Sequence, residues 1–146
     1  MFASAQEFVG PSNDVIATLL RVDPHLKNLA GWSEIRGSLA RLPYWDLDVF
    51  ELRAKLQTHC VVAVVGLSIM CKLGLLETMR LDEQEMYSYL KWVGKSMFDN
   101  PYHNNCHAAD VMHSVGLILY SRSTPDVRLP HTSPVSFSCR RPARPP

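Results

Sequence analysis

The sequence predicts an all-α protein, and three observations support this class. Apolar residues recur at helical spacing in several segments, and these segments are bounded by capping residues, glycines and prolines. The twelve residues 60–71 are almost entirely apolar, which is typical of a buried core helix. No convincing run of alternating apolar and polar residues predicts a strand.

The first helix is expected to begin at Asn13 or Asp14, either of which can cap it, and to end near Val22. Its apolar residues have helical spacing, and Pro24 ends it. Residues 1–12 contain Gly, Ser and Pro and are expected to be loose, while residues 26–42 predict short helical turns joined by linkers.

From Asp46 the apolar spacing becomes more regular, with Leu47, Phe50, Leu52 and Leu56 separated by charged residues. This spacing predicts a helix that starts near residue 46. A second helix is predicted over residues 60–73, which Gly74 ends in a left-handed conformation.

Asp82 and Glu85 resemble a capping box and predict the start of a third helix. Met86, Leu90, Val93 and Met97 form its apolar stripe. The break at Asn100-Pro101 ends this helix. A fourth helix is then expected to begin near His107 and to run to Tyr120.

The last 26 residues, 121–146, differ in composition from the rest of the chain. They hold six of the ten prolines and five arginines with one aspartate, a net charge of +4, whereas residues 1–120 carry 10 basic and 13 acidic residues, a net charge of −3. A segment of this composition cannot bury enough apolar surface to offset the entropy of ordering, so a disordered tail is expected.

The whole chain has 146 residues, 47% of them hydrophobic, and a net charge of +1, which gives no reason to expect nucleic acid or an anionic membrane as partner. Its most apolar run is twelve residues long, whereas a membrane span needs about 20, so no membrane span is expected. The four cysteines form no C-x-x-C pair, and Met1 to Gly10 has neither a basic residue nor a long apolar core. These features predict a cytoplasmic protein.

One stretch, residues 101–110, has the residue types of a reaction centre. Two histidines, His103 and His107, are four residues apart, and Asp110 follows three residues later. On a helix these positions are close to one face, which suits a metal ligand with an oriented neighbour.

This stretch, with Val111, resembles the Y-H-N-x-x-H-A-x-D-V signature of class I cyclic nucleotide phosphodiesterases at every fixed position. A looser resemblance extends from about residue 42 to residue 120 and includes Trp45 to Leu52, which look like the first helix of the family's catalytic domain. The resemblance implies the N-terminal, all-α third of such a domain over residues 42–120, with an N-terminal segment over residues 1–41 and the disordered tail over residues 121–146.

The family hydrolyses the cyclic phosphodiester of cAMP or cGMP with two divalent metals, a tightly bound zinc and an exchangeable magnesium or manganese. The resemblance implies that His103 is the general acid that protonates the leaving oxygen and that His107 is one metal ligand. It also places Asp110 as a carboxylate that orients its neighbours, and Tyr102 and Asn104 beside the substrate pocket.

Zinc needs about three protein ligands even in an open catalytic site, and the family takes the others from a His-Asp pair and a later Asp. This chain has no His-Asp dipeptide. We therefore expect the chain to be inactive by itself. The alternative is a non-catalytic interaction module whose exposed helix faces cause self-association.

Overall fold

The computed structural model describes residues 14–57 and 60–123, and all regular structure in this part of the chain is helical, which confirms the expected all-α class. The elements, in chain order, are α1 (Val15–Val22), the 3-10 helix η1 (Pro24–Asn28), α2 (Trp32–Leu39), α3 (Val49–Leu56), α4 (Val61–Lys72), α5 (Leu75–Thr78), α6 (Glu83–Ser96) and α7 (Asn105–Ser123).

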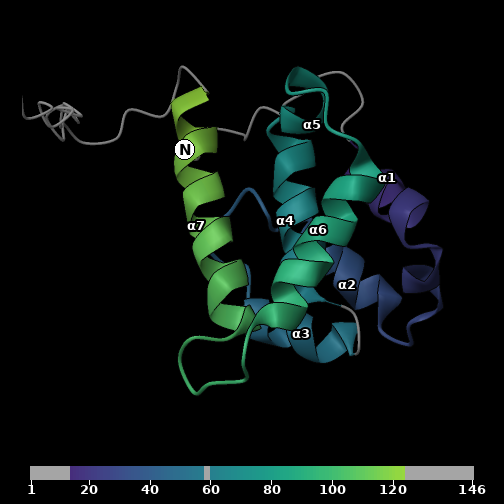
Figure 1. Cartoon of the computed structure of the whole chain (residues 1–146), viewed down its shortest axis with the longest axis vertical. Coiled ribbons are helices and arrows are strands. Elements are labelled where there is room, and N and C mark those ends of the chain that lie inside the picture. The colour runs from purple at the N-terminus through teal and green to yellow at the C-terminus, as the bar shows by residue number, and fades with distance from the viewer. Residues whose placement is uncertain (1–13, 58–59, 124–146) are drawn as a thin grey trace, which may run out of the picture.

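Helix α4 forms the centre of the fold, as its composition predicts. Every residue from Val61 to Ser68 is buried, and the helix packs against α1, α6 and α7. The hydroxyl of Ser68 donates to the carbonyl of Val64 at 2.6 Å, so this buried polar group is satisfied within the helix. Figure 1 shows α7 at one edge of the bundle and α1 and α2 on the opposite side of α4.

Three predicted helix boundaries are confirmed by local hydrogen bonds and dihedral angles. The Asp14 carboxylate accepts from the backbone N–H groups of Ile16 and Ala17, and the Asp82 carboxylate accepts from Glu85. Gly74 has φ of 67° and ψ of 18°, the left-handed conformation expected after α4.

A buried hydrogen bond joins α6 to the end of α1. The Tyr87 hydroxyl donates to Asp23 Oδ2 at 3.0 Å, and only 1% of Tyr87 is exposed. Burial, followed by the nearby Asp23 carboxylate, raises the pKa of Tyr87, so the phenol keeps its proton and remains the donor.

Several expectations about individual elements are wrong. Helix α3 begins at Val49 with Asp48 as its cap, because the Asp48 carboxylate accepts from Glu51 N–H at 2.9 Å, and Asp46 lies before the helix. Phe50 is 66% exposed, since the buried stripe of α3 runs through Val49, Leu52 and Leu56. The short helix α5 was not expected at all.

Other differences concern residues 26–42 and the ends of α7. Gly37 lies within the regular helix α2 and does not interrupt it. Helix α7 begins two residues before His107 and continues three residues past Tyr120 to Ser123. The expected loose segment of residues 1–12 and most of the expected tail, residues 124–146, lie outside the described residues.

No single helix in the described ranges is both long and apolar enough to cross a membrane. Helices α3 and α4 reach that length and composition only as a pair, and they are bent by 118° relative to each other.

Candidate functional site

The signature residues 101–110 form the loop between α6 and α7 and the first turns of α7. Residues 101–104 are a bend, which agrees with the restriction that Pro101 places on the chain. His103 therefore lies in the loop, and His107 and Asp110 lie on the helix.

Asn104 holds this loop against the start of α7. Its Oδ1 accepts hydrogen bonds from the backbone N–H groups of Cys106 at 3.0 Å and His107 at 3.1 Å, and its Nδ2 donates to the carbonyl of Asn100 at 3.0 Å. Its own carbonyl accepts from Ala108 N–H. Asn104 is thus the N-cap of α7, and the same side chain fixes the preceding loop.

Three aromatic rings meet at this junction. The ring centroid of Tyr102 is 4.9 Å from that of His103 and 4.6 Å from that of His107, and the two imidazole centroids are 5.6 Å apart. Tyr102 and His103 are exposed, and His107 is half-buried. The structure therefore brings the two predicted histidines together, with Tyr102 packed against both.

Asp110 is exposed and lies one turn after His107 on α7. Between described residues, no hydrogen bond joins its carboxylate to either imidazole of the cluster. Its orienting role stays a prediction.

The described residues do not by themselves fit a resident metal ion. No group of three or more His, Cys, Asp or Glu side chains within residues 14–57 and 60–123 is arranged to hold one. His103 and His107 could supply two imidazoles at most, which is fewer than the three protein ligands of an open zinc site.

Two neighbours on α7 have structural roles that the sequence pattern did not indicate. His113 is 3% exposed, and its Nε2 lies 3.0 Å from the carbonyl oxygen of Leu42. Cys106 is fully buried, and its Sγ is 3.9 Å from Arg53 Nη1. These contacts join α7 to Leu42 and to α3.

The side of α7 that faces away from His113 and Cys106 is apolar and exposed. Its residues follow helical spacing, and each is between 45% and 49% exposed: Val111, Val115, Ile118 and Leu119. In Figure 1 this helix borders the bundle on its outer side.

Comparison with known proteins shows what part of this chain is similar to. It is 34% identical over 77 residues to the human high affinity cAMP-specific and IBMX-insensitive 3′,5′-cyclic phosphodiesterase 8A, and this alignment covers 52% of the chain and 9% of the human protein. It is 32% identical over 88 residues to the probable 3′,5′-cyclic-AMP phosphodiesterase pde-4 of Caenorhabditis elegans, covering 60% of the chain and 13% of that protein.

A third relative is the mouse cGMP-inhibited 3′,5′-cyclic phosphodiesterase 3A, which is 29% identical over 77 residues, covering 51% of the chain and 7% of the relative. No family model and no solved structure matches the chain. About half of the chain is thus related in sequence to the cyclic nucleotide phosphodiesterases, which confirms the expected resemblance. The chain spans only a small part of the length of these relatives.

We expect Asn104→Ala to lower the free energy of unfolding by about 1 kcal/mol, because it removes the acceptor of two backbone N–H groups at the start of α7. Urea unfolding followed by circular dichroism measures the change. Asn104→Asp keeps the acceptor and loses only the donation to Asn100, so its loss should be smaller. Equal losses for the two variants would contradict the capping role.

Proposed function

We propose that residues 42–120 are part of the catalytic domain of a cyclic nucleotide phosphodiesterase that hydrolyses cAMP, cGMP or both. The observation that carries this proposal is the Tyr102, His103 and His107 cluster, which Asn104 holds at the start of α7 within a chain related to such enzymes. Hydrolysis of a phosphodiester is favoured by catalytic groups that are held in place before the substrate binds, and this loop holds two imidazoles in that way.

In this proposal His103 is the general acid. An alkoxide is a poor leaving group near neutral pH, so the 3′ oxygen needs a proton as its bond to phosphorus breaks, and an imidazole can donate one at this pH. The exposure of His103 on the loop supports this role, since a substrate could reach the ring.

His107 would supply one ligand of the tightly bound zinc, with magnesium or manganese as the second ion. Asp110 would orient a neighbouring ring or the loop, as carboxylates near metal histidines do. Tyr102 and Asn104 would border the phosphate pocket. Further metal ligands would have to come from residues other than those the structure describes.

We further propose that the 146-residue chain has no measurable phosphodiesterase activity by itself, because one or two imidazoles cannot retain zinc. The stretch that aligns with the relatives should nevertheless support hydrolysis of cAMP when it is placed within the full length of a relative. The test is a chimaera in which this stretch replaces the corresponding residues of the human 8A phosphodiesterase. Hydrolysis of cAMP by the chimaera, with none by the isolated chain, is the expected result.

The isolated chain should also contain no stoichiometric zinc by mass spectrometry. Hydrolysis by the purified chain itself, abolished by His103→Ala, would overturn the proposed inactivity. A chimaera that folds and binds metal but does not hydrolyse cAMP would contradict the proposed catalytic competence of the segment.

A non-catalytic interaction module is the second candidate function. The observation that favours it is the exposed apolar face of α7, at Val111, Val115, Ile118 and Leu119. Concentration-dependent self-association in analytical ultracentrifugation, lost in Val115→Glu, would favour this candidate.

A cytoplasmic location remains part of both proposals, and the free thiols of Cys60, Cys71 and Cys106 are consistent with it.

A further inference from the structure

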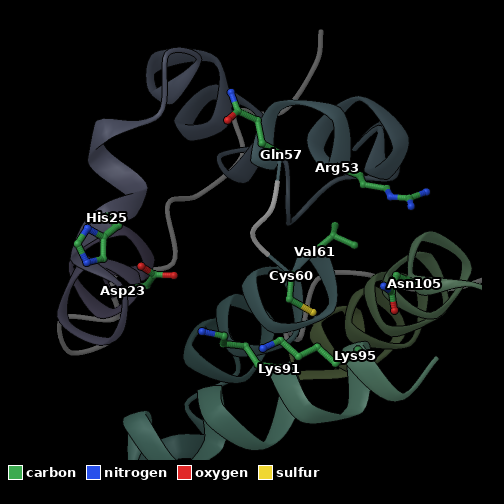
Figure 2. Close-up of a pocket in the computed structure, with 10 residues that line it drawn as sticks. Asp23, His25, Arg53, Gln57, Cys60, Val61, Lys91, Lys95 and Asn105 are labelled. Atoms are coloured by element: carbon green, nitrogen blue, oxygen red, sulfur yellow. The ribbon is translucent and has the colours of Figure 1, made fainter. Parts of the chain in front are cut away.

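A hollow lies apart from the histidine cluster, and neither His103 nor His107 lines it. It has a volume of about 430 Å³ and is bordered by the end of α1 with η1, the end of α3, the start of α4, one side of α6 and the start of α7. Figure 2 shows Asp23 and His25 on one side, Arg53 and Asn105 on the other, and Lys91 and Lys95 along α6. This volume is within the range of about 300–1,000 Å³ of small-molecule sites.

The walls of the hollow carry an excess of positive charge. Among the described lining residues, three cationic side chains, Arg53, Lys91 and Lys95, face one carboxylate, Asp23, which gives a formal net charge of +2 when His25 is not counted. Arg53 is partly paired, because its Nη2 lies 3.6 Å from Asp99 Oδ1. The charge balance therefore favours an anion.

The two lysines are the least compensated part of this lining. Lys91 and Lys95 are one helical turn apart, where like charges repel each other, and neither forms an ion pair with any described carboxylate. Lys91 Nζ is 5.6 Å from the centroid of the Tyr87 ring. This cation–π contact restricts the movement of the Lys91 side chain. An anion placed between the two ammonium groups would relieve their repulsion.

The side of the hollow at the start of α7 (Figure 2) offers a hydrogen-bond acceptor that lacks a partner among the described residues. Asn105 Oδ1 is buried and makes no hydrogen bond within the described structure. A buried acceptor of this kind is costly to leave unpaired, so a rotation of the Asn105 amide that exposes Oδ1 to a ligand hydroxyl would be favoured. The hollow thus combines a cationic side with an acceptor side.

We infer that this hollow binds a small phosphate ester that carries hydroxyl groups, with the phosphate at Lys91 and Lys95 and a hydroxyl at Asn105. Ammonium groups pair well with phosphate oxygens, and a sugar phosphate is small enough for the volume. The hollow is separate from the histidine cluster, so binding of a phosphate ester here does not depend on the proposed hydrolysis.

The test uses the full chain and isothermal titration calorimetry with ribose 5-phosphate, inorganic phosphate and ribose. Ribose 5-phosphate should bind more tightly than inorganic phosphate, and ribose should not bind. Lys91→Gln combined with Lys95→Gln should weaken the binding of ribose 5-phosphate by about tenfold or more, because two charge-assisted contacts are lost. Asn105→Ala should remove the advantage of the ester over inorganic phosphate.

A matched control changes two basic residues that do not line the hollow, Lys27→Gln combined with Arg36→Gln, which alters the net charge equally. This control should retain the affinity, and circular dichroism should show every variant folded. Absence of ribose 5-phosphate binding, equal affinity for inorganic phosphate, or equal losses in the lysine variant and the control would each overturn the inference.

Discussion

Replacing His103 by alanine in an active chimaera is expected to lower kcat for cAMP by about 10²–10⁴-fold, the usual contribution of a general acid. His103 is exposed on the loop and its ring lies edge-on to those of Tyr102 and His107, so it can reach a substrate without leaving the cluster. Alanine removes the proposed proton donor and leaves the Asn104 cap intact, because the capping bonds go to Cys106 and His107.

The leaving group distinguishes a general acid from a residue that only shapes the loop. A phosphodiester that releases a nitrophenolate needs little protonation, so His103→Ala should impair its hydrolysis far less than that of cAMP. His25→Ala is the matched control, since this exposed histidine on η1 is not part of the cluster. An equal loss for both substrates would show that His103 acts in some other way.

The parts of the fold that the sequence predicts well are those decided by local chemistry. Asp14 and Asp82 cap helices because their carboxylates reach backbone N–H groups two or three residues away, and Gly74 ends α4 because it tolerates positive φ. The uniformly apolar sequence of α4 likewise predicts a helix that is covered on all sides.

The parts that the sequence does not predict depend on partners that are distant in the chain. His113 is buried because its imidazole meets the carbonyl of Leu42, and nothing local to α7 indicates that contact. Phe50 has the spacing of a core residue and is exposed, since Val49 and Leu52 cover the interior there. Spacing indicates which residues share a face, whereas tertiary packing decides which face is buried.

The candidate site is likewise predicted only in part by the sequence. The signature predicts that His103 and His107 belong to one site, and the structure places their rings 5.6 Å apart. The basic hollow is bordered by residues from η1, α3, α4, α6 and α7 that are far apart in sequence, and the i, i+4 spacing of Lys91 and Lys95 is a local signal that the sequence analysis did not use. Such a site becomes visible only once the helices are packed.

We expect Gly94→Ala to destabilise the protein by about 2 kcal/mol, because α6 crosses closely over the start of α4 at this glycine. A Cβ atom at Gly94 would lie 2.3 Å from Cys60 Sγ and 3.6 Å from Val62 Cβ, so one of the helices or the thiol has to move. The gain in helix propensity, about 1 kcal/mol, offsets only part of this cost. Thermal unfolding should show a midpoint lower by roughly 8 °C.

Gly37→Ala is the control, because a Cβ there meets nothing within 4 Å and α2 is an ordinary helix, so this variant should gain about 0.5–1 kcal/mol. The clash itself is tested by adding Cys60→Ala to Gly94→Ala. Because the thiol is the atom that the new methyl meets, the double variant should recover at least about 1 kcal/mol relative to the sum of the single changes. Additive losses would mean that the crossing distance of α4 and α6 is limited by the backbone and not by Cys60.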